Sequence, residues 1–275
     1  MSQGTDEKDY VLGTHDEEIA RLGIQHGVWR DQADEAWRRG GFTAGQRLID
    51  LGCGPGYASL DLAEIVGSGG RVLAVDRSRR FLDALERVAG ERGLSQIETL
   101  ELDLDKQDLP VTGADGIWSR WVYAFVREPR RLLQRAAGAL RPGGVMVMHE
   151  YLDYRAWRSS PRSPDFEAFV DEVIQSWRAT GGEPDIGLDL PQWLSELGFA
   201  VRSLTPLVHI TRPGDRIWPW PKAFVEVGIR RMVDLGQIPE ARARDYNAAF
   251  ARVESTPCGF QITPTVIEVV AVKES

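Results

Sequence analysis

The stretch Asp50-Leu51-Gly52-Cys53-Gly54-Pro55-Gly56 has the composition of a ligand-binding turn. Glycine lacks the Cβ atom, so a backbone with glycine at alternate positions can turn sharply and pass close to a ligand. An apolar run, 47–49, precedes this turn, and the segment 57–66 can form a helix whose first N–H groups face that ligand. A strand, a glycine turn and a helix in this order are typical of a nucleotide-type site in an α/β sheet.

The spacing of the glycines in the turn differs from that of a dinucleotide-binding fingerprint. The dinucleotide fingerprint has two residues between its second and third glycines, whereas only Pro55 stands between Gly54 and Gly56. The chain also lacks a Tyr-x-x-x-Lys or similar hydride-transfer pair. The pattern therefore disfavours an NAD(P)-dependent oxidoreductase, which we keep as an alternative function.

Carboxylates follow the next two expected strands. Asp76 ends the apolar run 71–76, where a carboxylate can accept hydrogen bonds from both hydroxyls of a ribose. After the strand 97–102, an acid can accept from the exocyclic amine of adenine, with the Leu104 backbone N–H meeting a ring nitrogen. Counting from the strand favours Asp103 for this role, and counting back from Leu109-Pro110 favours Asp105. We prefer Asp103.

Strands and helices alternate between residues 45 and 150, which predicts a parallel sheet with helices on both faces. Ligands bind such a sheet beyond the carboxyl ends of its strands. The expected strands are 47–51, 71–76, 97–102, 116–119 and 145–148, and the expected helices are 57–66, a segment capped by Ser78, and 129–140.

The chain outside this region divides into three further parts. Residues 1–44 form an N-terminal helical cap with a helix over 16–40, and residues 1–9 are expected to be disordered. Residues 151–190 interrupt the alternation with an amphipathic helix, and we interpret them as a helical lid over the strand ends. Residues 191–275 complete the sheet with antiparallel strands at 201–210 and 262–272, and helices at 221–235 and 239–254 lie between them.

The ordered set of these motifs, together with Arg141-Pro142-Gly143-Gly144 before the fifth strand, resembles a class I S-adenosylmethionine-dependent methyltransferase over residues 45–150. Tyr10-Val11-Leu12-Gly13 and the helices after it are similar to small-molecule methyltransferases of the ubiquinone/menaquinone-biosynthesis type. The resemblance implies an α/β, Rossmann-like, seven-stranded, mostly parallel sheet whose last strand is antiparallel. It also implies S-adenosyl-L-methionine as the cofactor.

The resemblance implies a set of cofactor contacts: glycine-turn contacts to the methionyl part, ribose and adenine contacts, and closure from the N-terminal helices. These residues are Tyr10, Gln25, Asp50, Gly52, Cys53, Gly54, Gly56, Asp76, Arg77, Asp103, Leu104, Ser119 and Arg120. The reaction is an in-line displacement at the methyl carbon, which needs no metal. A base is needed only where the acceptor carries a proton that must leave.

The acceptor side is predicted from residues at the carboxyl ends of the fourth and fifth strands and in the lid. His149 is the candidate general base, because its ordinary pKa is near ~6.5. Side chains alternate along a strand, so only one of His149 and Glu150 is expected to reach the pocket. Aromatic walls suit a planar or apolar acceptor. The candidate acceptor contacts are Trp121, Tyr123, Glu150, Tyr151, Tyr154, Trp157 and Trp177.

Composition excludes several partners. The net charge of the 275-residue chain is −8 with no long basic run, which disfavours nucleic acid. No apolar stretch approaches the ~20 residues needed to cross a bilayer. Two cysteines, Cys53 and Cys258, and a polar N-terminus without a signal pattern suit a reducing cytoplasm. We therefore expect a cytoplasmic monomer or homodimer that methylates O or N, rather than C, of a small molecule. A non-catalytic S-adenosylmethionine-binding protein is the second alternative.

Overall fold

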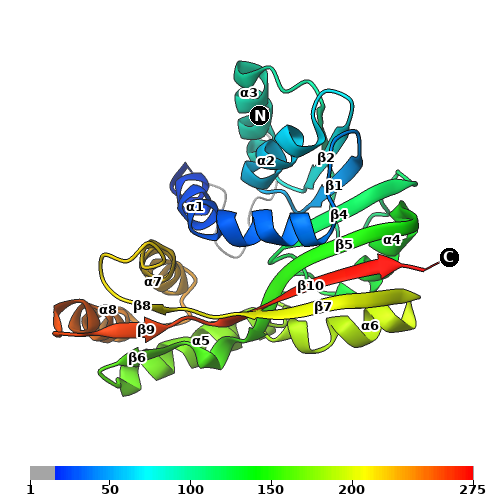
Figure 1. Cartoon of the computed structure of the whole chain (residues 1–275). Helices are drawn as coiled ribbons and strands as arrows, with labels where there is room; N and C mark the ends of the chain where they lie inside the picture. The colour runs from blue at the N-terminus through cyan, green and yellow to red at the C-terminus, as the bar shows by residue number, and fades with distance from the viewer. Residues whose placement is uncertain (1–15, 275) are drawn as a thin grey trace, which may run out of the picture.

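A computed structural model describes residues 16–274 of the chain. Its centre is a seven-stranded sheet in the order β3-β2-β1-β4-β5-β10-β7, shown in Figure 1. The strands are β1 (Arg47–Leu51), β2 (Arg71–Asp76), β3 (Ile97–Glu101), β4 (Ala114–Arg120), β5 (Leu140–Asp153), β7 (Phe199–Leu207) and β10 (Thr265–Lys273).

The register of the sheet brings the carboxyl ends of its parallel strands to one edge. Leu51 at the end of β1 pairs with Val75 on β2 and with Ser119 on β4. β10 runs antiparallel to both neighbours, β5 and β7. The predicted seven-stranded, mostly parallel sheet with an antiparallel strand is therefore confirmed.

Helices cover both faces of this sheet because each carries one apolar stripe. Trp37 of α1 and Leu62 of α2 pack with Trp118 and Val147 on one face. On the other face, Leu133 of α4 joins the main core. These elements are α1 (Asp16–Arg39), α2 (Tyr57–Val66), α3 (Arg79–Arg92), α4 (Pro129–Ala139) and α6 (Leu190–Glu196). The helix predicted over 16–40 is thus confirmed.

A second lobe extends from the start of β10, at the lower left of Figure 1. It contains a three-stranded sheet in the order β6-β9-β8 and three helices. Its elements are β6 (Arg158–Ser160), β8 (Ile210–Thr211), β9 (Phe260–Ile262), α5 (Pro164–Ala179), α7 (Pro219–Asp234) and α8 (Glu240–Ser255).

Two predicted strands are each divided in the structure, which corrects the sequence analysis. The segment 201–210 separates into β7 and β8, and 262–272 separates into β9 and β10. Pro264 lies at the second break and has no N–H to donate to a ladder. At the breaks, the His209 N–H donates to Thr263 Oγ1 at 3.0 Å, and the Thr263 N–H donates to the His209 carbonyl at 2.9 Å.

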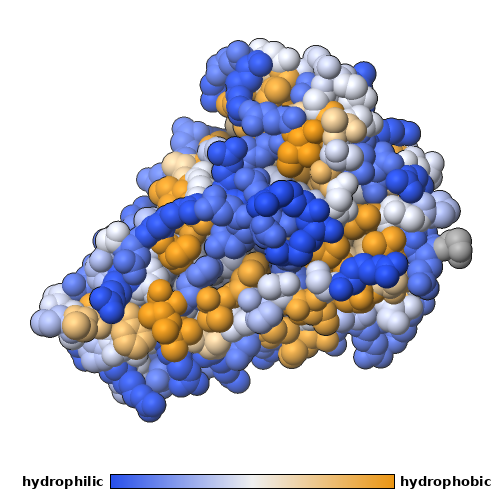
Figure 2. Space-filling view, viewed as in Figure 1, coloured by the Kyte–Doolittle hydropathy of each residue, from blue (hydrophilic) through white to orange (hydrophobic). Residues whose placement is uncertain are grey.

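The amphipathic helix that we interpreted as a lid is α5. Ser163 caps it by accepting a hydrogen bond from the Phe166 N–H at 3.3 Å. Its apolar face packs against α8 and the turn Tyr154–Ala156, so α5 belongs to the second lobe. On the face drawn in Figure 2, hydrophilic residues cover most of the surface and apolar residues form separate patches. Among residues 16–274, we find no helix long and apolar enough to cross a membrane.

Candidate active site

The three glycines of the turn have different surroundings. All three have left-handed backbones, with φ of +68° at Gly52, +55° at Gly54 and +81° at Gly56. A Cβ at Gly52 would lie 2.5 Å from Val122 Cγ2, and one at Gly56 would overlap the Leu85 side chain. Among residues 16–274, a Cβ at Gly54 would meet a single atom of α1, at 3.8 Å. Gly52 and Gly56 therefore permit packing within the protein, and Gly54 leaves one side of the turn open.

Asp76 ties the turn to the end of β2. Its Oδ2 accepts a hydrogen bond from the Gly54 N–H at 2.9 Å, and its Oδ1 accepts from the Ser78 N–H at 2.8 Å. The residue is buried, and burial raises the pKa of the carboxyl group. Each carboxylate oxygen has a second acceptor site, so these two bonds leave room for ligand hydroxyls.

Asp50 and Cys53 support the turn from inside the protein. The Ser59 hydroxyl donates to Asp50 Oδ2 at 2.5 Å, which fastens the end of β1 to α2. Burial raises the pKa of Asp50 to about 6. Cys53 packs beside Leu82 and Leu85, and burial raises the pKa of its thiol. The structure therefore gives both side chains internal partners instead of placing them on the open side of the turn.

Asp103 and Asp105 differ in their partners, although Asp103 Oδ1 also accepts from the Asp105 N–H at 3.0 Å. Asp105 Oδ1 accepts from the Arg127 N–H at 2.8 Å, so this carboxylate holds the loop after β4. Asp103 is half-buried and forms an ion pair of 2.8 Å with the exposed Lys106. Desolvation raises the pKa of Asp103, but the hydrogen bonds from Lys106 and the Asp105 N–H and the charges of Lys106 and Arg77 outweigh it, so the pKa of this carboxyl group is lowered. This arrangement favours Asp103 for a ligand contact.

Arg120 ends β4 beside the glycine turn. Its Nη2 donates to His26 Nδ1 at 3.1 Å, whereas its Nη1 is buried with no hydrogen-bond partner among residues 16–274. Burial lowers the pKa of Arg120 to about 10, and Asp50 opposes this shift. The neighbouring Ser119 is buried, and its hydroxyl also has no partner. Two unpartnered polar groups therefore lie at the end of this strand.

The predicted contacts from the N-terminal helices are only partly described. Gln25 is partly buried on α1, and its Oε1 accepts from Arg21 Nη1 at 3.1 Å. Tyr10 lies outside the described residues.

Leu104, predicted to meet the adenine ring through its backbone N–H, is buried. Its carbonyl accepts from Arg135 Nη1 at 3.0 Å.

Glu150 is a structural residue, which corrects its assignment to the acceptor. Its carboxylate is fully buried and accepts three backbone N–H bonds, from Val122 at 2.8 Å, Tyr123 at 3.0 Å and Ala124 at 3.3 Å. The group therefore shapes the loop after β4 from the protein side. Burial raises the pKa of Glu150 to about 7, and the three N–H donors oppose the shift.

His149 is likewise in the core, so the structure does not support it as a general base. The ring is fully buried between Trp29 and Trp118, and its Nε2 lies 3.4 Å from Glu268 Oε2. Arg39 of α1 also binds Glu268, at 2.7 Å and 2.8 Å. Burial lowers the pKa of His149. Both side chains are fully buried and contact protein groups, so the structure does not support the expectation that one of them meets the acceptor.

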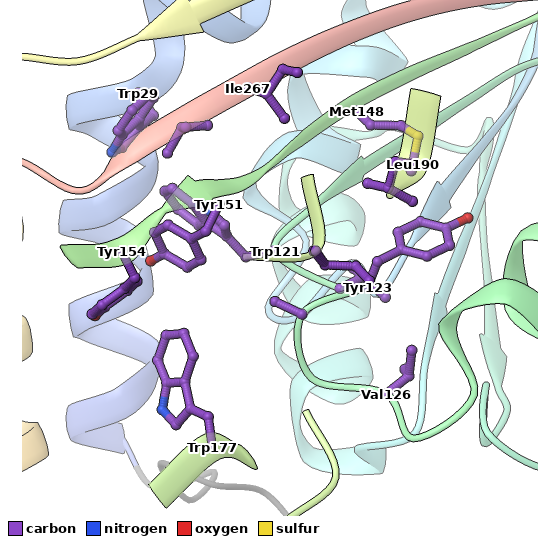
Figure 3. Close-up of a cluster of buried hydrophobic side chains, with 14 of the residues drawn as sticks. Trp29, Trp121, Tyr123, Val126, Met148, Tyr151, Tyr154, Trp177, Leu190 and Ile267 are labelled. Carbon is purple, nitrogen blue, oxygen red and sulfur yellow. The ribbon is translucent and has the colours of Figure 1, made fainter. Parts of the chain in front are cut away.

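Four of the predicted aromatic residues form a continuous cluster, drawn in Figure 3. Trp121 stacks on Tyr151, with ring centroids 5.3 Å apart and an interplanar angle of 18°. Tyr154 meets both Tyr151 and Trp177 edge-on, at 4.9 Å each. Tyr123 lies apart from this cluster, near Met148 and Leu190 in the close-up.

Trp157 belongs to the core of the second lobe. Its ring packs edge-on against Phe166 at 5.4 Å and Phe169 at 5.8 Å, and its Nε1 donates to Gln261 Oε1 at 3.1 Å. Trp157 also meets Tyr154 edge-on, at 5.9 Å, so it joins the aromatic cluster to the core of the second lobe.

Two tryptophans that we did not assign to the site complete the cluster. Trp220 of α7 stacks on Trp121 at 5.6 Å and 10°, and Trp29 of α1 meets both rings edge-on. Trp121 itself has a left-handed backbone, with φ of +53°. Such a backbone is strained for a bulky residue and is found most often at functional sites. The rings of the site thus come from the first helix, two strand ends and the second lobe.

Comparison with known proteins identifies the class of this site. Residues 49–148 match the protein family described as methyltransferase domain. The chain is 27% identical over 141 residues to aklanonic acid methyltransferase DauC of Streptomyces sp. strain C5, covering 50% of this chain and 64% of that protein. It is 26% identical over 150 residues to demethylmenaquinone methyltransferase of Desulfitobacterium hafniense, covering 52% and 59%. The chain thus spans about three fifths of each of these relatives.

A solved structure shows the same fold. Coclaurine N-methyltransferase, bound to N-methylheliamine and SAH, superposes with a TM-score of 0.58 at 16% identity, covering 88% of this chain and 72% of that one. This likeness shows the fold that the sequence resemblance implies. The match of residues 49–148 to the methyltransferase domain family confirms the resemblance of the chain to class I, S-adenosylmethionine-dependent methyltransferases.

The residues at the site fit the cofactor of this family, S-adenosylmethionine. The space in the Cβ direction of Gly54 is open, and a side chain at this position would fill it. Asp76 has spare acceptor sites for hydroxyl groups, and Arg120 Nη1 is a buried donor without a partner. The carboxylate of Asp76 suits the ribose hydroxyls, the open backbone at Gly54 leaves room beside the turn, and the guanidinium of Arg120 suits the methionyl carboxylate, all groups or space that S-adenosylmethionine requires.

Proposed function

We propose that this chain transfers a methyl group from S-adenosylmethionine to O or N of a small aromatic or apolar acceptor. The observation that carries the proposal is the open glycine turn at the same sheet edge as a strained, stacked tryptophan. When bound, the cofactor supplies an electrophilic methyl group on a sulfonium. The chain orients that group and excludes water, which is how a displacement with dispersing charge is accelerated.

Each end of the cofactor has a proposed partner. Asp76 accepts from the ribose hydroxyls and Asp103 accepts from the adenine amine. The exposed Arg77, whose charge acts to lower the pKa of both carboxyl groups, flanks the adenine. Arg120 Nη1 binds the carboxylate of the methionyl part. Support comes from the burial of Asp76, the half-exposed carboxylate of Asp103 and the missing partner of Arg120 Nη1.

The acceptor is proposed to contact the aromatic cluster around Trp121. Offset stacking and edge contacts of its rings suit a planar ligand, and aromatic faces attract a sulfonium by cation–π interaction. Tyr151, Tyr154, Trp177 and the two added tryptophans, Trp29 and Trp220, belong to this cluster. His149 has no role as a base in this proposal, because its Nε2 faces the buried Glu268, which Arg39 also binds.

Replacing Asp76 with alanine is expected to weaken the binding of S-adenosylhomocysteine (SAH) at least tenfold, since charge-assisted hydrogen bonds each contribute ~1.5–3 kcal/mol. Asp76→Asn is the matched control. It keeps one acceptor oxygen and the shape of the side chain, so it should lose less affinity than Asp76→Ala. Calorimetric titration measures both. A folded Asp76→Ala protein with the affinity of the wild type would place the ribose contact elsewhere.

The transfer itself is tested by release of SAH during incubation with S-adenosylmethionine and a panel of phenols, aromatic amines and apolar amines. We expect release that depends on an aromatic member of the panel. Binding of the cofactor without release for any acceptor would instead indicate a non-catalytic S-adenosylmethionine-binding protein. Binding of NAD in place of SAH would favour the oxidoreductase alternative.

A further inference from the structure

A chain of polar contacts links α2 and α1 to Arg120 at the end of β4. His26 Nε2 lies 2.8 Å from Asp61 Oδ2, and His26 Nδ1 lies 3.1 Å from Arg120 Nη2. Arg30 holds the same Asp61 with two hydrogen bonds of 2.9 Å. The His26 ring also stacks on Tyr57, with centroids 5.9 Å apart. None of these residues packs as a plain apolar side chain, although His26 lies on the apolar face of α1.

The chemistry of these groups fixes the proton on His26. A guanidinium has donors and no acceptor, so Nδ1 of His26 must accept from Arg120. Nε2 then carries the proton and donates to Asp61. Burial and the charge of Arg120 both lower the pKa of His26, which keeps the imidazole neutral, while Asp61 acts in the opposite direction. His26 is therefore an acceptor aimed at Arg120 and oriented by a carboxylate.

The contact with His26 decides where the rest of the guanidinium points. Arg120 Nη2 is occupied by His26, while Nη1 is buried and has no partner in the part of the chain that the structure describes. The guanidinium carbon lies 5.4 Å from the centre of the Trp121 ring and 5.9 Å from that of Trp118, which confines it further. A long, flexible side chain loses rotamer freedom when it binds a ligand. Fixing it beforehand reduces that loss.

We propose that His26, oriented by Asp61, is a positioning residue that holds Arg120 ready for the carboxylate of the cofactor. This inference rests on the proposed function, because it assigns Arg120 Nη1 to the methionyl carboxylate of S-adenosylmethionine. His26 touches neither the cofactor nor the reacting atoms in this scheme. It acts through Arg120.

Two substitutions of His26 separate positioning from simple packing. The Asn side chain places its oxygen near the position of Nδ1, so His26→Asn keeps an acceptor for Arg120. The Gln side chain places its amide near the position of Nε2, so His26→Gln keeps the contact with Asp61 and loses the acceptor. Both variants lose the ring stacked on Tyr57. A packing role predicts equal effects, whereas a positioning role predicts a difference.

The probes are SAH, which carries the methionyl carboxylate, and 5′-methylthioadenosine, which lacks it. By calorimetry, His26→Gln should bind SAH about tenfold more weakly than the wild type, the loss expected for one charge-assisted hydrogen bond. It should bind 5′-methylthioadenosine with unchanged affinity. His26→Asn should keep most of its affinity for SAH. Asp61→Ala, a second variant, should repeat the selective loss for SAH.

Equal losses for both probes, or equal affinities of the Asn and Gln variants for SAH, would overturn the positioning role. Thermal unfolding of each variant shows whether it is folded, and Asp61→Ala provides the test if His26→Gln is not. Binding of 5′-methylthioadenosine and SAH by the wild type with the same affinity would also overturn it, since Arg120 would then hold no carboxylate. If the wild type binds neither probe, the proposed function itself fails.

Discussion

Replacing Gly54 with valine is expected to weaken the binding of SAH roughly 100-fold or more, a cost of about 3 kcal/mol. The backbone at Gly54 is left-handed, with φ of +55°, and its Cβ direction is open apart from one atom of α1. A branched side chain would occupy the space into which we place the cofactor. Calorimetric titration of the folded variant with SAH measures the loss.

Gly93→Val is the matched control for backbone strain. Gly93 ends α3 with a φ of +68°, and a Cβ there would meet nothing within 4 Å. This variant should lose stability to a similar strain and bind SAH as the wild type does. A folded Gly54→Val protein that also keeps wild-type affinity would show that the cofactor does not pass over the turn.

Replacing Glu150 with alanine is expected to lower the free energy of unfolding by at least about 3 kcal/mol, because each unsatisfied buried group costs ~1–3 kcal/mol. Three buried N–H groups, those of residues 122–124, lose their acceptor together. Trp121, whose backbone is strained, precedes these three residues in the chain and loses the support of the Glu150 carboxylate. Denaturant unfolding measures the change. A loss under about 1 kcal/mol would mean that water or a shifted loop replaces the carboxylate.

Glu150→Gln is the control, and it also gives a pH test. Its oxygen can keep the bonds to Val122 and Tyr123, so a smaller loss is expected. Burial raises the pKa of Glu150 to about 7 in the folded protein, above the ~4.3 of an exposed carboxyl group. The contribution of this group to stability is therefore fully present below about pH 4 and is lost as the pH rises through 7. The stability of the wild type relative to Glu150→Gln should fall between about pH 4 and about pH 7, and a difference independent of pH would contradict the raised pKa.

The central fold was predictable because its signals are local and repeated. Buried parallel strands such as β2 are continuous apolar runs, and the glycine turn follows β1 directly. The second sheet was missed because β6 and β9 have three residues each and β8 has two, too short for any periodicity to show. The break at Pro264 was visible in the sequence, but the long apolar run after it concealed the change of sheet.

The residues of the candidate site that belong to one sequence motif could be predicted. Contacts between segments far apart in the sequence could not. Gly54 of the turn donates a hydrogen bond to Asp76 at the end of the neighbouring strand, and motif spacing locates both residues. The bond between Glu150 and the loop 122–124 joins segments 26 to 28 residues apart, so alternation along β5 did not reveal it. Trp220 reaches Trp121 from the second lobe, and no sequence pattern predicts that contact.

The most direct test of the account is a calorimetric titration of the full chain with SAH, with NAD titrated in parallel. The account predicts saturable binding of SAH at one site per chain and no heat of binding for NAD. It predicts as well that the heat with SAH is lost in Gly54→Val and kept in Gly93→Val. Binding of NAD, or the absence of SAH binding by the folded wild-type protein, would contradict the proposal that the turn from Gly52 to Gly56 holds the cofactor of a methyltransferase.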